Sequence, residues 1–350
     1  MTLHNLSRTR FFLFLIFSFS FLISAGAQTW SGVGSGAKGS FTPMCVHNGK
    51  LYVGGMDSVG KKATHLASWD GKMWASPDSD FQGSITAMVE YNGKLYAGTE
   101  IGTGNSASYN LLRWNDTLWK YVGSANGRIN ALYVMKGELY IGGSFTKADT
   151  VAAKHIVKYS DSAGWHKVGH GLPNNVWALI VFREMLYAGG QFESVERLNG
   201  KSWEDVMSSG QQYKTGWVKG FTNYFDELYA CGEFNYLLKW NSQAWSPVGP
   251  FNDGASAMAF YDNGLFVGGG FTSVPGVDNV FHITNYQNST RAWSCMGGVI
   301  YWAGDCKTYT GTVSSLAVYK NELYVGGQFM IAGGKFASNI AKWTVPMENK

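Results

Sequence analysis

Three histidines are the side chains best suited to bind a metal ion, because imidazole is the commonest metal ligand in proteins. They are His65, His155 and His282, and none of them belongs to a short ligand motif such as His-Glu-x-x-His. The sequence also lacks a phosphate-binding loop and the Gly-x-Ser-x-Gly turn of serine hydrolases. A metal centre would therefore require the fold to bring distant segments together.

Carboxylates offer a second chemistry, since glycoside hydrolysis uses two carboxyl groups about 5–10 Å apart. Candidate acids in segments that we expect to be loops are Asp57, Asp78, Asp80, Asp149 and Asp253. Scattered loop acids are usually solvated, so we expect no catalytic residue among them. We also expect no metal and no cofactor. A hydrolase or lyase that acts on polysaccharide through loop carboxylates is the alternative interpretation.

The elements that position these residues come from a repeat. The phrase Leu-Tyr-x-Gly-Gly, or a close variant, occurs seven times, and the copies start 37 to 58 residues apart. They begin at Leu51, Leu95, Leu139, Leu186, Leu228, Leu265 and Leu323. Thr99 replaces the second glycine of one copy, and Cys231 replaces the first glycine of another.

Each copy predicts four short strands. An alternating apolar stretch and a short turn such as Asn48-Gly49 precede the phrase, and Asn-Gly between apolar runs is the strongest short hairpin signal. A variable segment then leads to a third and a fourth strand with an aromatic residue each, and the fourth ends in Val-Gly, as at Val122-Gly123. Four short strands per 40–50 residues are typical of β-propeller blades. We predict an all-β protein, a seven-bladed β-propeller of four-stranded blades.

Composition agrees with this fold. The 350 residues include 45 glycines, 15 % are aromatic and only 15 % are charged, which excludes intrinsic disorder and argues against helix bundles. The formal net charge of +4 gives no indication of a nucleic-acid partner.

The ends of the repeat predict how the ring closes. The last copy stops at Trp343 after three strands, whereas Trp30 to Gly36 reads as a fourth strand with no first three before it. We expect residues 28–36 to pair with the C-terminal blade and to leave no open edge there. The three histidines each lie four residues before the aromatic of a third strand, a place that Asn110 and Asn339 occupy elsewhere. Equivalent places on different blades are far apart, so we expect these side chains to make blade-edge hydrogen bonds.

The N-terminus predicts secretion. Arg8 and Arg10 precede an apolar run of about 13 residues, shorter than the roughly 20 of a spanning helix, and Ala25-Gly26-Ala27 fits a cleavage site. We expect a signal peptide over 1–27, the propeller over 28–345 and a short tail over 346–350. No membrane span is expected in the mature chain, which we place outside the cytoplasm.

The cysteines agree with an oxidising compartment. Cys295 and Cys306 bracket the longest insertion, and this spacing in a secreted chain predicts a disulfide. We expect Cys45 and Cys231 to be buried free thiols. The tripeptides at Asn115 and Asn288 match glycosylation acceptors, which matter only in a eukaryotic host.

The double glycine followed by two aromatic residues, as in Trp69 and Trp74, resembles the kelch repeat. The segment from Leu323 to Trp343 is similar to repeats of secreted bacterial propellers and of fungal cortical cell-polarity marker proteins. The resemblance implies the fold, while function in such families lies in the loops. Secreted kelch-like propellers include copper oxidases resembling galactose oxidase, but no Tyr–Cys–His set of that kind maps onto this chain.

These observations predict a secreted, monomeric, non-catalytic binding or scaffold module for an extracellular glycan or protein. A structural component of the cell surface is a third interpretation. Binding residues concentrate in variable loops on rigid scaffolds, and exposed aromatics beside polar groups suit sugar rings or protein contacts. The largest variable loop, 297–311, carries Tyr301, Trp302, Asp305, Lys307 and Tyr309. Alternatively, Tyr301 and Trp302 fold back onto their own domain.

Overall fold

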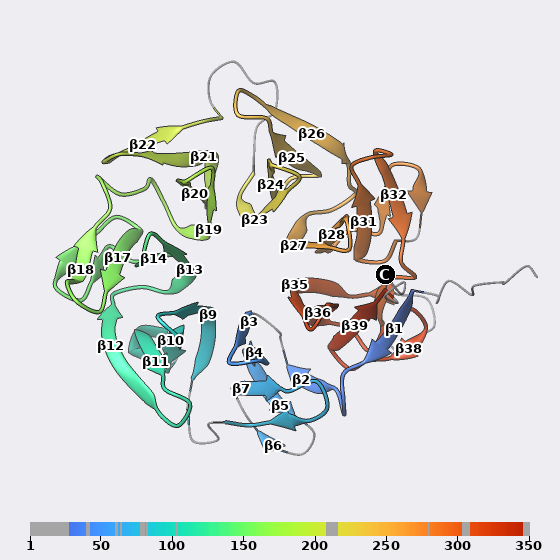
Figure 1. Ribbon diagram of the computed structural model, residues 1–350, viewed down its shortest axis with the longest axis horizontal. Coiled ribbons are helices and arrows are strands. Elements are labelled where there is room, and N and C mark those ends of the chain that lie inside the picture. Colours follow the sequence, from blue (N-terminus) through green and yellow to red (C-terminus); the bar gives the residue numbers. More distant parts are fainter. Residues whose placement is uncertain are drawn as a thin grey trace, which may run out of the picture.

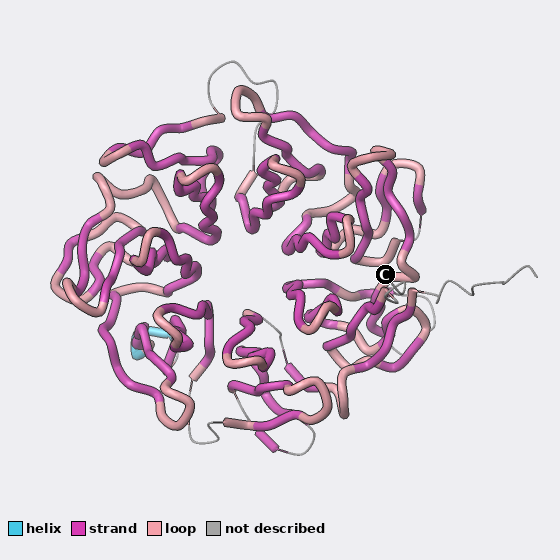
Figure 2. The backbone as a smooth tube through the Cα atoms, in the orientation of Figure 1, coloured by secondary structure: helices cyan, strands magenta, loops and turns pink. Residues whose placement is uncertain are grey.

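The computed structural model describes residues 28–345, apart from 40–42, 60, 61, 64, 78–80, 82, 103, 208–215, 279 and 303–308. Strands and turns make up these residues, and the helical segment among them is a single 3-10 turn, η1 (Gly104–Ser106) (Figure 2). The sheets stand radially around a common centre and follow one another in sequence order (Figure 1). The predicted all-β propeller with four-stranded antiparallel sheets is confirmed.

Each radial sheet has a core of four strands, which lie side by side in order from the centre to the rim (Figure 1). The innermost strands are β3 (Met44–His47), β9 (Ser84–Tyr91), β13 (Ile129–Met135), β19 (Val176–Phe182), β23 (Val218–Tyr224), β27 (Ala255–Tyr261) and β35 (Thr312–Tyr319). The second strands are β4 (Lys50–Gly54), β10 (Lys94–Ile101), β14 (Glu138–Gly143), β20 (Met185–Gly190), β24 (Glu227–Gly232), β28 (Gly264–Gly269) and β36 (Glu322–Gln328).

The third and fourth strands complete each sheet. The third strands are β7 (Leu66–Trp69), β11 (Ser108–Trp114), β17 (Ile156–Ser160), β21 (Phe192–Asn199), β25 (Tyr236–Trp240), β31 (Ile283–Gln287) and β39 (Ile340–Thr344). The outermost strands are β8 (Trp74–Ala75), β12 (Trp119–Ala125), β18 (Gly164–Lys167), β22 (Ser202–Asp205), β26 (Trp245–Pro250), β32 (Ala292–Cys295) and β1 (Thr29–Gly32).

The segments that connect these strands contain further short strands. They are β2 (Ala37–Gly39), β5 (Met56–Val59), β6 (Lys62–Ala63), β15 (Lys147–Ala148), β16 (Val151–Ala152), β29 (Ser273–Val274), β30 (Val277–Asp278), β33 (Val299–Trp302), β34 (Tyr309–Thr310), β37 (Ile331–Ala332) and β38 (Lys335–Phe336). The β15–β16 hairpin extends the neighbouring sheet, because Ala148 pairs with Ala125 of β12.

Strand β1 pairs antiparallel with β39, so the two ends of the described chain share one sheet of order β1-β39-β36-β35. Trp30 lies opposite Trp343, and their rings are 5.1 Å apart. The indole N–H of Trp30 donates to the carbonyl of Met296. Trp30 is 4 % exposed, so an N-terminal residue belongs to the core of the C-terminal sheet.

The turns between the first and second strands share one backbone conformation. Both central residues have positive φ, as in Asn48-Gly49, Asn92-Gly93 and Lys136-Gly137. A turn of this kind matches the right-handed twist of the strands that it joins, which explains the Asn-Gly signal. Phe225-Asp226 adopts the same conformation with φ of 47° and 55°, although phenylalanine, unlike aspartate, rarely adopts a positive φ.

The first glycine of each Gly-Gly pair faces the first strand of the next sheet. A Cβ on Gly142 would lie 2.5 Å from Cγ1 of Val176, so a larger residue has no room there. Cys231 occupies this position in β24. The first strand of the next sheet, β27, begins with the small residue Ala255, and Cys231 and Ala255 belong to the same core cluster. Gly220 lies opposite Cys231 in the register and leaves room for the sulfur atom. The exception in the repeat is thus matched by two small neighbours.

Tyrosines at the end of several first strands connect neighbouring sheets. Each donates a hydrogen bond from its hydroxyl to a carbonyl in the first turn of the next sheet. The pairs are Tyr91–Gly137 at 2.9 Å, Tyr224–Asn263 at 2.9 Å, Tyr261–Asn321 at 3.0 Å and Tyr319–Gly49 at 2.7 Å. The tyrosines are at most 4 % exposed, so these bonds lie at the margin of the inter-sheet core.

Candidate functional site

Many of the half-buried charged groups join strands within a sheet. An acid that begins the second strand pairs with a lysine of the third strand, and the distances are 2.8 Å in Glu138–Lys158, 2.9 Å in Glu227–Lys239 and 2.7 Å in Glu322–Lys342. The hydroxyls of Tyr229 and Tyr324 donate to Glu227 and Glu322 at 3.0 and 3.1 Å. These groups are engaged in the scaffold and are poor candidates for catalysis.

The three histidines lie in three different sheets, before β7, β17 and β31. His155, His282 and Asn339 have φ of 63°, 73° and 68°, a left-handed conformation in which Asn and His are enriched. Their backbone N–H groups donate to the phenylalanine that follows the second strand, namely Phe145, Phe271 and Phe329. In these sheets the backbone conformation favours His or Asn, whereas His65 at the equivalent position does not have a positive φ. The three histidines lie in different sheets, so their side chains do not converge.

The side chain of His282 is nevertheless unusual. Its Nδ1 donates to the carbonyl of Gly270 at 2.9 Å, whereas Nε2 is buried without a hydrogen-bond partner. Burial, opposed by that hydrogen bond and by Asp253, lowers the pKa of this imidazole below its ordinary 6.5. Among the described residues no three His, Cys, Asp or Glu side chains are placed to hold a metal ion.

The candidate acids do not form a pair in the described residues. Asp253 accepts the backbone N–H of Gly254 at 2.6 Å and shapes the approach to β27. Asp149 lies at the tip of the β15–β16 hairpin with φ of 49°, in a different sheet. The side chain of Asp57, and Asp78 and Asp80 altogether, lie outside the described residues.

The structure describes only part of the predicted binding loop. Tyr301 and Trp302 belong to β33 and Tyr309 to β34, where Tyr301 pairs with Thr310 and Trp302 with Tyr309. Their side chains, and Asp305, Cys306 and Lys307 altogether, lie outside the described residues. The Cys295–Cys306 disulfide accordingly stays a prediction. Cys231 is a buried free thiol, whereas Cys45 is only partly buried, and burial raises the pKa of each to about 12.

A pair of tryptophans from neighbouring sheets forms an exposed aromatic surface that sequence reasoning missed. Trp177 lies at a β-bulge of β19, where the register shifts between Val176 and Ala178, and Trp217 directly precedes β23. Their rings meet edge to face with centroids 5.3 Å apart and an interplanar angle of 84°. Trp217 is 38 % exposed and Trp177 is partly buried. Among the described residues neither indole N–H has a hydrogen-bond partner.

Polar groups flank this pair. Lys219 and Glu233 form an ion pair of 2.9 Å, and the backbone N–H of Glu233 donates to the carbonyl of Trp217 at 2.9 Å. On the side of Trp177, the amide of Asn175 donates to Gln191 at 2.7 Å. An aromatic surface with charged and amide groups beside it can stack on a ligand ring and bind its polar edge.

The repeat itself contains the signal for these residues. At the bulge position of Trp177, other sheets have Thr86, Asn130, Lys219, Ser256 or Ser314. At the position of Trp217, directly before the first strand, other sheets have Arg128, Asn175 or Gly254. Most of the 14 tryptophans pack at repeat positions, whereas Trp177, Trp217 and Trp302 stand outside them. A tryptophan that the fold does not require is a candidate for binding.

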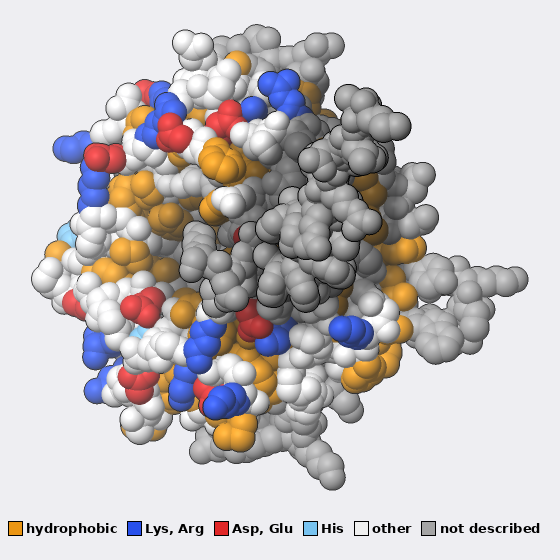
Figure 3. Space-filling model, turned by 45° about the vertical axis from the view of Figure 1, so that its right-hand side comes forward, with side chains coloured by type: hydrophobic (Ala, Val, Ile, Leu, Met, Phe, Trp, Pro, Cys, Tyr) orange, Lys and Arg blue, Asp and Glu red, His pale blue; other side chains and the backbone are white. Residues whose placement is uncertain are grey.

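The visible face in Figure 3 carries basic and acidic side chains interspersed with apolar ones. The described side chains that are visible on that face form no continuous basic stripe. In the described residues we find no helix of the length and apolarity that crossing a membrane requires.

Comparison with solved structures supports the propeller fold. The computationally designed protein Ika8 superimposes with a TM-score of 0.54 and 13 % identity over 89 % of this chain and 98 % of its own. The WD40 β-propeller domain of Doa1 does so with a TM-score of 0.55 and 10 % identity over 91 % of this chain and 94 % of its own. No family model and no curated protein matches the sequence. At these identities the likeness concerns the fold alone.

Proposed function

We propose that this protein is a secreted, non-catalytic binding module that contacts an extracellular glycan through the Trp177–Trp217 pair. The exposed edge-to-face indoles carry the proposal, since the repeat does not need tryptophan at either position. Indole faces pack against the C–H faces of sugar rings. The indole N–H groups, which have no partner among the described residues, and the neighbouring polar side chains suit hydroxyls. A protein ligand, the other interpretation from the sequence, would use the same aromatics as contact residues.

The scaffold that we propose is a seven-bladed propeller closed by residues 28–36, following a signal peptide over 1–27 and ending in a short tail over 346–350. The pairing of β1 with β39 supports this closure. The kelch-like character of the repeat and the contribution of Tyr301, Trp302, Asp305, Lys307 and Tyr309 to binding belong to the same proposal. The Cys295–Cys306 disulfide would stabilise that loop in an oxidising compartment.

A glycan array with the mature protein tests the proposal. The matched variants are Trp217→Ala, Trp177→Ala and the control Tyr121→Ala, which removes a 64 % exposed aromatic from the outer strand β12. We expect binding to a subset of glycans, a loss of about tenfold or more in both tryptophan variants, and unchanged binding in the control. Undiminished binding in the tryptophan variants, or no glycan bound by the parent protein, would refute it.

A further inference from the structure

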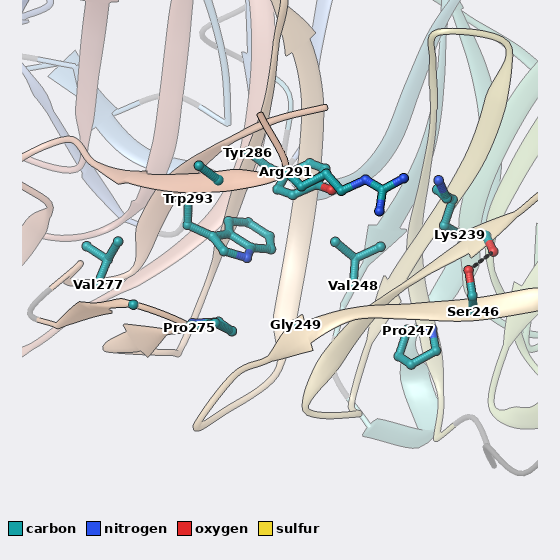
Figure 4. Close-up of a pocket in the computed structure, with 12 residues that line it drawn as sticks. Lys239, Ser246, Pro247, Val248, Gly249, Pro275, Val277, Tyr286, Arg291 and Trp293 are labelled. Carbon is teal, nitrogen blue, oxygen red and sulfur yellow. Dashed lines mark hydrogen bonds between the residues drawn. The ribbon is translucent and has the colours of Figure 1, made fainter. Parts of the chain in front are cut away.

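A groove lies at the rim between two neighbouring sheets. It has a volume of ≈ 590 Å³ and runs between the outer strands β26 and β32 (Figure 4). Its apolar lining comes from Pro247 and Pro275 and from the small exposed parts of Tyr286 and Trp293. The polar side chains of the lining include Lys239, Ser246 and Arg291. The volume lies within the range of small-molecule binding sites.

The walls of the groove are held rigidly. Trp293 is 9 % exposed, with ring centroids 4.9 Å from Tyr286 and 5.2 Å from Phe251. It packs over Gly249, where a Cβ would lie 3.0 Å from the indole nitrogen and 2.9 Å from Cγ of Pro275. The groove thus has a preformed shape.

Two basic side chains, those of Lys239 and Arg291, line the groove, and among the described residues only Lys239 has an ion-pair partner. Lys239 is neutralised by Glu227 at 2.9 Å, as in the equivalent lysines of other sheets. Arg291, in the turn before β32, is exposed, and within the described chain it has neither an ion pair nor a hydrogen bond. Figure 4 shows its guanidinium extending across the groove towards the side of Lys239. Among the described residues, the guanidinium of Arg291 therefore has no acidic partner in the groove, and the rings of Pro247 and Pro275 lie in the same lining.

We propose that this groove binds an acidic saccharide, with Arg291 holding the carboxylate of a uronic acid residue. Guanidinium and carboxylate match in a two-point hydrogen bond, and the rings of Pro247 and Pro275 suit the apolar face of a sugar ring. The hydroxyl of Ser246, in the groove lining, donates to the carbonyl of Lys239 at 3.4 Å, and its oxygen can still accept a hydrogen bond from a sugar hydroxyl. Because β26 and β32 are the outermost strands of their sheets, an acidic peptide that pairs with a strand edge is the competing ligand, and a glutamate-rich peptide tests it. This site goes beyond the proposed function, because it lies at the outermost strands β26 and β32, whereas Trp177 and Trp217 lie at the innermost strands β19 and β23.

Isothermal titration calorimetry with the mature protein tests the inference, using trigalacturonate, neutral maltotriose and a glutamate-rich peptide as probes. The variants are Arg291→Gln, Trp217→Ala and the control Lys201→Gln, which removes an exposed cation from the equivalent turn of another sheet. We expect trigalacturonate to bind, maltotriose to bind about tenfold more weakly or not at all, and affinity to decrease with salt. Arg291→Gln is expected to weaken trigalacturonate binding about tenfold, while the control Lys201→Gln leaves it unchanged.

Other results would overturn the inference. Equal affinity in Arg291→Gln, or tighter binding of the acidic peptide than of trigalacturonate, would reject the site or its ligand class. A loss confined to Trp217→Ala would place the saccharide at the tryptophan pair, which supports the proposed function and contradicts this one.

Discussion

The hydroxyl of Tyr319 donates a 2.7 Å hydrogen bond to the carbonyl of Gly49, 270 positions earlier in the sequence. Sequential sheets make the same bond, as in Tyr91–Gly137 and Tyr261–Asn321. The last and first copies of the repeat are therefore related in space as consecutive copies are, which supports the proposed ring.

Replacing Tyr319 by phenylalanine removes this hydrogen bond and keeps the ring packing. We expect a loss of about 1 kcal/mol in the free energy of unfolding, or a fall of about 2 °C in Tm. Calorimetry on Tyr319→Phe measures it. Tyr133→Phe is the control, because the Tyr133 hydroxyl has no hydrogen-bond partner in the described chain, and an equal fall in both variants would contradict the prediction.

Removing β1 exposes the edge of β39 and deletes a core tryptophan. Loss of a buried aromatic costs about 3–5 kcal/mol, so a variant lacking residues 28–36 is expected to melt well below the parent. Trp30→Ala separates the packing contribution from the strand pairing, and it is expected to show part of the same loss. An unchanged melting temperature in the shortened protein would contradict closure through β1.

Cys231 and Ala255 form a matched pair where other sheets have glycine and a β-branched residue. Ala255→Val alone is expected to destabilise the protein by about 1–3 kcal/mol, because the added methyl groups meet the sulfur atom. Cys231→Gly in the same chain restores the repeat pattern and is expected to recover most of that loss. Urea unfolding of the two single variants and the double variant measures the coupling, and strictly additive effects would show that the two residues are independent.

His282 makes stability depend on pH. Its folded pKa lies below the ordinary 6.5, so the unfolded chain binds its proton first as the pH falls. We expect the contribution of His282 to the free energy of unfolding to be fully present above about pH 6.5 and to decrease below it. Protonation of the folded protein would place a second, unpartnered N–H in the core. In His282→Asn the decrease in Tm from about pH 7.5 to about pH 5 is expected to be smaller. Asparagine suits the backbone there, as Asn339 shows with φ of 68°, and an unaltered pH profile would exclude His282 as the source.

Local patterns in the sequence determined the strands of this protein and their order. Asn-Gly turns, alternating apolar residues and paired aromatics act over a few residues, so the four-stranded antiparallel units could be predicted from residues such as Asn48, Leu139 and Trp114. The turn glycines also follow from the repeat, because turns such as Asn48-Gly49 recur in it. The left-handed φ of His155 and His282 comes from the structure, since His65 at the equivalent position does not share it.

Only the tertiary structure decided which side chains meet between sheets. The contact of Trp177 with Trp217 depends on a bulge and on the angle between two sheets, neither of which a single copy encodes. The groove under Arg291 likewise depends on how Trp293 packs over Gly249 of the preceding sheet. Such contacts join residues far apart in sequence, and their energy comes from the shape complementarity of whole sheets, so no local pattern contains them.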